Sequence, residues 1–415
     1  MSTACAVPLI RGPQMAQRQP ARVARVCPSG ARAPAPLRLT RPAVGLEAGA
    51  RRRAAASSFV RFAASAEPST ITEQPSTSEV AVPDMDTLSY SKQYDEVFSK
   101  PLVTNKAISK PNRDAQADEP GAIKVLGSDV HAVSKRKLWF GREWDNTDKT
   151  YLAFIAGMHV LALAAPFCFS WNMVALFAVG YFITGCLGIT LSYHRQLSHK
   201  SFKTPKWLEY ILAYCGVLAV QGDPIEWVSS HRYHHLHCDT PLDPHSPFEG
   251  FWWSHAGWLL DHKAVEARVS DRSNANDMQK QWFYRFIEKT YVWHIVASFA
   301  ALYAFGGFPA VVWGGALRTI WVYHITWFVN SAAHVWGSQD YNTGDLSRNN
   351  WWVGVLAFGE GWHNNHHAFE FSARHGLKWW QVDMTWMIIS AFKAVGLASA
   401  VKLPSEAQKA RLAFN

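Results

Sequence analysis

Histidine is the residue whose placement along this chain points to chemistry. Nine of the 18 histidines lie in four short groups, which are His194 with His199, then His231, His234 and His235, then His334, and finally His363, His366 and His367. Neutral imidazole binds zinc, copper, iron and nickel, so the groups predict a metal centre. Nine imidazoles exceed what one ion holds, and two metals with roughly four or five ligands each would use them all.

The spacing within the groups predicts how the rings are presented. Residues at i, i+3 and i+4 share one face of an α-helix, so each His-x-x-His-His group is expected to point three rings the same way. His194 and His199 are about 140° apart around an ideal helix, so one of them is expected beyond the helix end. For His334, which stands alone, ligation and packing are equal alternatives.

Imidazole alone does not distinguish zinc from iron. A structural zinc site would close at four ligands, and the His-Glu-x-x-His pattern of hydrolytic zinc sites is absent from the sequence. A dinuclear, oxygen-activating iron site beside a membrane uses all nine histidines. The isolated His159, His294 and His324 are predicted to be packing residues. The other histidines are expected near the ligands or on the surface, and they are His237, His245, His255, His262 and His375.

Four apolar segments are long enough to bring these groups to one side of a membrane. Tyr151–Phe169 and Trp171–Tyr193 are uncharged runs of 19 and 23 residues, near the roughly 20 needed to span a bilayer. A second pair, Tyr291–Phe308 and Pro309–Ala333, contains one charged residue, Arg318. Because two hairpins return the chain to its starting side, the sequence predicts an all-α integral membrane protein with four transmembrane helices and its histidines on one membrane face.

Shorter segments complete this membrane domain, which is expected over residues 136–405 with a C-terminal tail at 406–415. Trp207–Val220 and Trp351–Phe358 are too short to cross and are predicted to be re-entrant or buried. Helical spacing of apolar residues from Trp379 to Phe392 predicts an amphipathic surface helix. Four cysteines lack metal-binding spacing and are expected to be free thiols, and they are Cys168, Cys186, Cys215 and Cys238.

The N-terminal part of the chain differs in composition. Residues 1–66 hold eleven Arg, no Lys and one acid, Glu47, which is typical of a plastid transit peptide. A disordered basic tail that binds anionic lipid or nucleic acid is the alternative. Without these residues, 30 basic and 31 acidic side chains remain of the 41 and 32, so the net charge of +9 gives no support for nucleic-acid binding. Residues 67–135, rich in Ser, Thr, Pro and acids, are expected to be a disordered linker.

The histidine groups resemble the three boxes of the membrane fatty acid desaturase family. The similarity runs from about Lys135 to Lys402 and rests on His194-x-x-x-x-His199, His231-x-x-His234-His235 and His363-x-x-His366-His367. Within that family, the chain looks like the plant and algal plastid branch of the delta-9-type enzymes. The residues that carry this closer likeness are Gln221-Gly-Asp-Pro-Ile-Glu-Trp227, Asp243-Pro-His-Ser-Pro247 and Gly359-Glu-Gly-Trp-His-Asn-Asn-His-His-Ala-Phe-Glu370.

The resemblance implies a set of ligands for two iron ions. One iron would be held by His194, His199, His231, His235 and His366, and the other by His234, His334, His363 and His367. Asn330 would act on the second iron through a water, although by itself this residue is equally a helix-packing amide.

The resemblance also implies the reaction. Two electrons and O2 would remove two hydrogens from adjacent methylenes of an acyl chain and leave a cis double bond, with a bent apolar tunnel measuring its position. The sequence lacks a nucleotide-binding glycine motif and a fused haem domain, so the electrons are expected from a separate carrier. In a plastid, ferredoxin is the natural donor.

Substrate and location have several alternatives. The motifs look most like delta-7 desaturases that act on palmitate of plastid galactolipid, in an envelope or thylakoid membrane. A delta-9 acyl-lipid enzyme is the second interpretation, and an acyl-CoA delta-9 desaturase of the endoplasmic reticulum, supplied by cytochrome b5, is the third. Two further alternatives differ in function: a hydroxylase on the same di-iron scaffold, and a histidine-rich membrane metal transporter that is not an enzyme.

Overall fold

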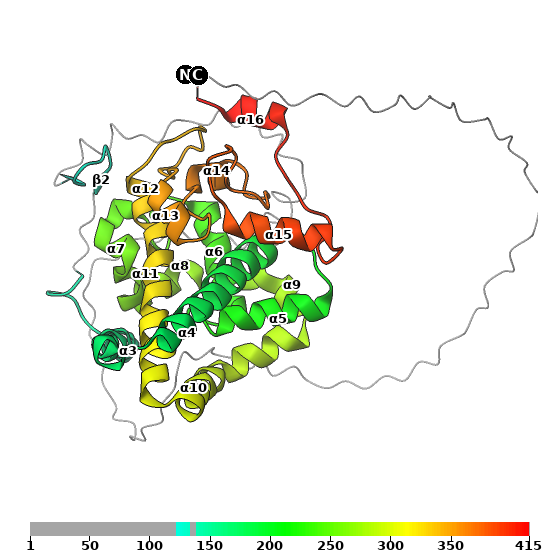
Figure 1. Ribbon diagram of the computed structural model, residues 1–415. Helices are drawn as coiled ribbons and strands as arrows, with labels where there is room; N and C mark the ends of the chain where they lie inside the picture. Colours follow the sequence, from blue (N-terminus) through cyan, green and yellow to red (C-terminus); the bar gives the residue numbers. More distant parts are fainter. Residues whose placement is uncertain (1–121, 133–137, 415) are drawn as a thin grey trace, which may run out of the picture. The chain divides into compact units, whose positions relative to one another are not determined.

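The computed structural model describes residues 122–132 and 138–414, in which most elements are helices (Figure 1). The expected transit peptide at 1–66 and most of the expected linker lie outside the described residues. In Figure 1, α12 (Ala332–Val335), α13 (Trp351–Leu356) and α14 (His363–Ala368) lie together in the upper part of the domain, whereas α3 (Asn146–Ala162) and α10 (Trp282–Ala310) lie at its lower end. The short connecting elements are η3 (Pro247–Glu249), α7 (Phe251–His255), η4 (Gly257–Leu260), α8 (His262–Val269), η5 (Ser273–Ala275) and α9 (Asn276–Gln279).

The first pair of apolar segments forms α3 (Asn146–Ala162) and α4 (Trp171–Tyr181), joined through η1 (Ala165–Cys168). The hydroxyl of Ser170 caps α4 by accepting a hydrogen bond from the backbone N–H of Met173 at 3.3 Å. A turn at this position is what the sequence predicts.

The helix that follows α4 is wound differently from an α-helix. It is η2 (Phe182–Ser198), a π-helix in which hydrogen bonds run from each residue to the fifth one before it. The backbone N–H of His199 donates to the carbonyl of His194 at 3.2 Å, so residues five apart stack on one side. His199 lies just beyond the helix end, as expected, but the 140° separation assumed for an ideal α-helix is wrong here.

The second pair of apolar segments consists of α10 (Trp282–Ala310), η6 (Val311–Leu317), α11 (Arg318–Asn330) and α12 (Ala332–Val335). Gly307 breaks the run with φ 62° and ψ −160°, a conformation open to glycine, and Pro309 follows. The chain reverses there, and α10 packs against η6.

Two helices in the described part of the chain are long and apolar enough to cross a membrane. They are Trp171–Ser198, of 28 residues, and Trp282–Val335, of 54 residues and broken at Gly307. In the most apolar window of the second, 11% of the residues are buried within the protein. The count of four transmembrane helices stays a prediction.

Shorter helices close around the histidines. They are α5 (Lys206–Val217), α6 (Pro224–His237), α13 (Trp351–Leu356), α14 (His363–Ala368) and α15 (Met384–Ala394). The carboxylate of Asp223 caps α6 by accepting from two backbone N–H groups. Asp383 caps α15 through the N–H of Trp386, so the amphipathic helix starts at Met384 and not at Trp379. The expected start was wrong because capping by Asp383 outweighs apolar periodicity.

Close approach between η2 and α5 depends on a glycine. A Cβ added to Gly188 would lie 2.5 Å from the backbone of Cys215 and Gly216. The backbones of the two helices are therefore in direct contact at this position. This contact determines the position of the C-terminal end of η2, which carries His194, relative to α5.

Part of the expected linker is ordered. Residues 122–132 form a hairpin of β1 (Ile123–Lys124) and β2 (His131–Ala132), paired antiparallel. Val130 is buried against Phe248 and Leu346, and the hydroxyl of Ser128 donates to the carbonyl of Val335 at 2.9 Å. The expectation of disorder is wrong for these residues because distant segments supply the burial that their own composition lacks.

The C-terminal tail is also structured. Residues Glu406–Leu412 form α16, with Ser405 and Gln408 in a capping box. The carbonyl of Leu412 accepts from the N–H of Asn342 at 2.8 Å, which ties the tail to the loop after α12.

Candidate metal centre

Five imidazoles converge in what we call the first cluster, which consists of His194, His199, His231, His235 and His366. One ring nitrogen of each lies within 4.8 Å of the others. The Nε2 atoms of His199 and His231 are 2.8 Å apart. The Nε2 atom of His366 lies 3.0 Å from that of His194 and 2.9 Å from that of His235. The end of η2, α6 and α14 supply these rings from three separate parts of the sequence.

The distances in the first cluster fit a cation better than shared protons. Two ligands at right angles, each about 2.1 Å from an ion, are about 3.0 Å apart. Nδ1 of His194 lies 2.7 Å from Glu360, so Nε2 of His194 carries a lone pair. Nδ1 of His235 lies 3.2 Å from Glu370, whose pKa burial raises to about 8. The Nε2 atoms of His194 and His235 both face the same nitrogen of His366, which has at most one proton. A transition-metal ion would satisfy all five nitrogens.

The buried setting keeps these rings in the form that binds metal. Burial, and then repulsion from neighbouring imidazoles, lowers the pKa of His199, His231, His235 and His366 well below the ordinary value. The rings are therefore neutral at physiological pH, and neutral imidazole is the form that coordinates metal.

The second cluster consists of His234, His334, His363 and His367. Ring nitrogens of His234, His334 and His367 and the Sγ atom of Cys238 lie within 4.8 Å of one another. Nε2 of His363 is 3.0 Å from Nε2 of His334. Nε2 of His367 is buried and has no hydrogen-bond partner among the residues that the structure describes. This unpaired nitrogen indicates that the second cluster could also hold an ion.

Each His-x-x-His-His helix serves both clusters. Adjacent residues on a helix are about 100° apart, so His235 faces the first cluster with His231 while His234 faces the second. On α14, His366 and His367 divide in the same way. The expectation that each group points three rings in one direction is therefore wrong. The first cluster contains the five histidines that the family resemblance implies for one iron. The second group within 4.8 Å contains His234, His334 and His367 but has Cys238 in place of His363, and ligation itself stays a prediction.

Three aspartates face the outer nitrogens of the second cluster. The contacts from Nδ1 to carboxylate are His234 with Asp243 at 3.0 Å, His334 with Asp239 at 3.1 Å and His367 with Asp345 at 2.9 Å. Burial opposes ionisation of Asp243 and Asp345, but the neighbouring histidines outweigh it and hold the pKa of each carboxyl well below its ordinary value. Such contacts fix the tautomer and leave Nε2 to face a metal.

A buried ion network supports His194. The guanidinium of Arg195 donates to Glu360 at 3.0 and 3.1 Å and pairs with Asp383 at 2.9 and 3.0 Å. Nδ1 of His375 also lies 3.1 Å from Glu360. Burial opposes ionisation of Glu360, but Arg195 and the histidines hold the pKa of Glu360 well below its ordinary value. These contacts hold the ionised carboxylate of Glu360 beside Nδ1 of His194.

The isolated histidines lie outside the clusters. Nε2 of His159 lies 3.0 Å from Nε2 of His324, whose Nδ1 lies 3.0 Å from Nε2 of His255. His294 contacts the hydroxyl of Tyr214 at 3.2 Å. Their hydrogen bonds across helices are those of packing residues, as expected.

Cys238 and the carboxylates are the site residues that the sequence reasoning missed. All four described cysteines are free, as predicted, but the Sγ atom of Cys238 lies 3.6 Å from Nδ1 of His367. Burial and nearby aspartates raise the pKa of the Cys238 thiol well above its ordinary value. Its position four residues after His234, directly after the end of α6, was the available signal. Asp239 and Asp345 gave none, because their partners come from distant segments.

Asn330 is the last residue of α11, half-buried and four residues before His334. In the described part of the chain, the Asn330 side chain makes no hydrogen bond to either cluster. Its proposed action through a water stays a prediction.

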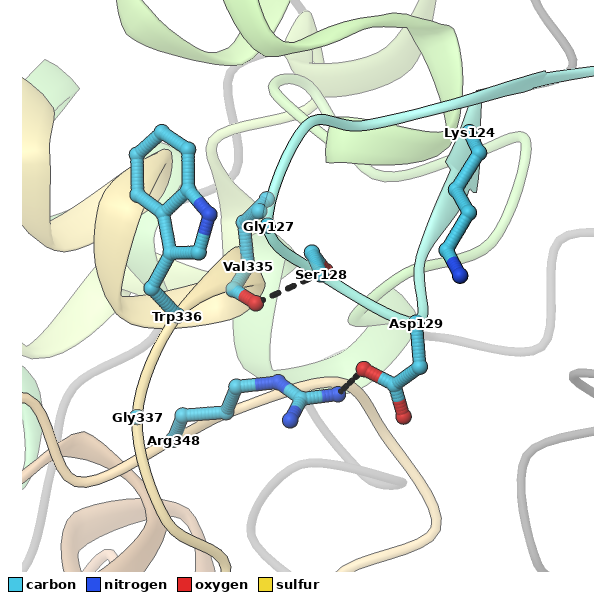
Figure 2. Close-up of a pocket in the computed structure, with 8 residues that line it drawn as sticks. All are labelled: Lys124, Gly127, Ser128, Asp129, Val335, Trp336, Gly337 and Arg348. Carbon is cyan, nitrogen blue, oxygen red and sulfur yellow. Dashed lines mark hydrogen bonds and ion pairs between the residues drawn. The ribbon is translucent and has the colours of Figure 1, made fainter.

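A cavity of about 490 Å³ lies beside the segment that carries His334. Figure 2 shows the hairpin residue Ser128 bonded to Val335, the residue after His334, and Arg348 paired with Asp129. The hairpin thus holds this segment from outside.

Comparisons with known proteins agree with the chemistry of the clusters. The model of the family described as fatty acid desaturase matches residues 169–397, which contain all nine clustered histidines. The chain is 58% identical over 301 residues to a chloroplastic palmitoyl-monogalactosyldiacylglycerol delta-7 desaturase of Arabidopsis thaliana, covering 72% of this chain and 81% of that protein.

Other relatives carry related names. An acyl-CoA 5-desaturase of Anemone leveillei is 52% identical over 292 residues, covering 70% of this chain and 91% of its own length. A delta-9 acyl-lipid desaturase of Arabidopsis thaliana is 50% identical over 300 residues, covering 72% and 98%. These likenesses decide between an enzyme and a metal transporter: the chain belongs to the fatty acid desaturase family and is an oxidoreductase that desaturates fatty acyl chains.

Proposed function

We propose that this desaturase uses two iron ions and O2 to place a cis double bond at the delta-7 position of palmitate on a plastid galactolipid. The balanced reaction converts two adjacent methylenes, O2, two electrons and two protons into an alkene and two waters. The observation that carries the proposal is the convergence of five ring nitrogens within 4.8 Å, together with a second histidine cluster, in a chain of this family.

The nine clustered histidines are the proposed ligands. The first cluster would hold one iron, and the second cluster would hold the other, with Asn330 acting through a water. Iron with O2 supplies an oxidant able to attack an unactivated C–H bond, which no side-chain acid or base can do. Burial lowers the pKa of six of these imidazoles and so favours the neutral form that binds metal. Carboxylates fix the tautomer of the rings that they face, and seven of the nine rings are buried away from water.

Four transmembrane helices are proposed, in two hairpins that leave both clusters on the stromal face. The low burial of the most apolar window of Trp282–Val335, 11%, supports a membrane position for this helix, because exposed apolar side chains require lipid around them. The shorter α3, of 17 residues, would cross with η1. A bent apolar tunnel between the helices would admit the acyl chain.

The substrate proposal follows the relatives. Identity is 58% to the delta-7 palmitoyl-galactolipid enzyme and 50% to the delta-9 acyl-lipid enzyme, which supports the former. The acyl-CoA 5-desaturase at 52% makes an acyl-CoA substrate the second candidate. The Arg-rich residues 1–66 would direct the chain to a plastid envelope or thylakoid membrane, where ferredoxin would supply the electrons.

Expression of the full chain in a plastid-containing host that lacks delta-7 hexadecenoate tests this proposal. Double-bond positions are measured by gas chromatography and mass spectrometry of derivatised fatty acids, sorted by lipid class. We expect delta-7 hexadecenoate confined to galactolipid, and none with His231→Ala. A delta-9 product would contradict the position, a product confined to the acyl-CoA pool would contradict the carrier, and hydroxylated products would contradict the proposed reaction.

A further inference from the structure

The two clusters differ in the charge that surrounds them. In the second cluster, three of four imidazoles face an aspartate, and the side chains of Asp239, Asp243 and Asp345 are 3%, 0% and 11% exposed. Among the described residues, no Lys or Arg side chain forms an ion pair with any of the three. Arg268 reaches the backbone carbonyl of Asp243, but its charge is paired with Glu249 at 2.7 Å.

The first cluster has fewer carboxylates, and they are partly neutralised. Two of its five imidazoles face a carboxylate. Glu360 is paired with the buried guanidinium of Arg195, which also pairs with Asp383, so these three groups keep one net negative charge. The other carboxylate, Glu370, is 27% exposed and therefore screened by water.

This difference acts on any bound ion. A carboxylate on the outer nitrogen of a ligand histidine raises the basicity of the ring and strengthens metal binding. Buried negative charge also favours the more positive oxidation state, since electrostatic interactions are weakly screened away from water. The three buried aspartates of the second cluster have no paired cation in the described part of the chain. They should therefore strengthen metal binding and stabilise the ferric state more than the one net negative charge and the solvent-screened carboxylate beside the first cluster.

We propose that the two metal positions are inequivalent, with the second cluster binding its iron more tightly and stabilising the ferric state, and with Asp239, Asp243 and Asp345 as the positioning residues responsible. This inference rests on the metal centre proposed above. It assigns functions to three aspartates that touch neither metal nor substrate and act through His334, His234 and His367.

Asp345→Asn is the most informative variant. Oδ1 of Asp345 accepts from the hydroxyl of Thr343 and from the N–H and hydroxyl of Ser347, whereas Oδ2 faces His367. An asparagine can keep the Oδ1 contacts, so the loop is retained while the charge is lost. Glu370→Gln is the matched control, because it removes a carboxylate from a histidine of the first cluster.

The test measures iron release from the full chain, loaded anaerobically with two equivalents of ⁵⁷Fe²⁺ and challenged with the coloured ferrous chelator ferrozine. We expect two phases of one iron each, with the slow phase at least about ten-fold slower. Asp345→Asn should accelerate the slow phase about ten-fold or more, and Glu370→Gln should change only the fast phase. Asp239→Asn serves as a second variant if Asp345→Asn does not fold.

A redox titration followed by Mössbauer spectroscopy gives an independent readout, since a merely structural role of the aspartates would not move a potential. One iron should stay ferric to lower potential, and Asp345→Asn should bring the two potentials closer. Release of both irons in one phase with equal potentials, or an unchanged slow phase in both Asp→Asn variants, would overturn the inference and leave the proposed function standing. A chain that retains no iron would overturn the metal centre itself.

Discussion

Glu360→Gln is the substitution for which the structure gives the clearest expectation. The side chain is 6% exposed, so water cannot replace its contacts with Arg195 and His194. The guanidinium of Arg195 would keep its two contacts with Asp383 and would not be stranded. The loss of unfolding free energy is therefore expected below the roughly 3–5 kcal/mol of a buried pair broken outright, at about 1–3 kcal/mol.

Metal affinity should fall as well. Removing the carboxylate from the outer nitrogen of a ligand histidine costs about 10–100-fold in affinity, or about 1.4–2.8 kcal/mol. We expect the iron held by the first cluster to be weakened, because Glu360 faces His194 and touches no ring of the second cluster.

The stabilisation by ionised Glu360 should depend on pH in a definite direction. Because the folded-state pKa of Glu360 is held below its ordinary value of about 4.5, its contribution to stability is fully present above that pH. It is lost as the pH falls through the folded-state pKa. The difference between wild type and Glu360→Gln should therefore be constant from pH 6 to 8 and should shrink only below about pH 4.5.

Thermal unfolding of the solubilised protein and iron content after dialysis measure both effects. Glu370→Gln, at a carboxylate that is 27% exposed, is the control and should have the smaller effect on each. A Glu360→Gln protein with wild-type melting temperature and wild-type iron content would refute the reasoning.

Three other perturbations have definite expected outcomes. Gly188→Ala should lower the melting temperature strongly, because the added Cβ would lie 2.5 Å from the backbone of α5. Gly157→Ala, which has open space around it, is the control and should leave the melting temperature nearly unchanged. Equal melting temperatures of the two variants would contradict the close helix crossing. A chain beginning at residue 133 should be less stable to heat than one beginning at 122, because it loses the burial of Val130 and the contact of Ser128 with Val335; identical unfolding curves would show that the hairpin contributes nothing. Cys238→Ala should retain two irons by elemental analysis, because burial and nearby aspartates raise the pKa of the thiol and so oppose the thiolate form that would coordinate. Loss of one iron would identify Cys238 as a ligand.

The membrane-domain elements were largely readable from local pattern. The turn at Ser170, the break at Gly306 and Gly307, and the short helices before the second and third boxes all follow from apolar length and from glycine. Two boundaries were misjudged, the first for a local reason and the second because of contacts with distant segments. Asp383 caps α15 later than the apolar periodicity suggests, and the hairpin at 122–132 is ordered by contacts with residues more than a hundred positions away.

For the candidate centre, the sequence by itself determined the nine histidines as the chemistry-bearing residues, and it did so because helix packing alone rarely requires clustered imidazoles directly after apolar segments. The count of rings also predicted two metal positions, and this number stays a prediction. The helical spacing brought His231 and His235 onto one face, as i and i+4 require.

Only the tertiary structure decided how the rings divide. His234 and His235 are adjacent in sequence yet face different clusters, since neighbouring positions on a helix point about 100° apart and segments from elsewhere complete each cluster. The π-helical end of η2, which stacks His194 and His199, has no signal in apolar periodicity. The aspartates and Glu360 meet their histidines through contacts between segments remote in the chain, and such contacts depend on packing rather than on local pattern.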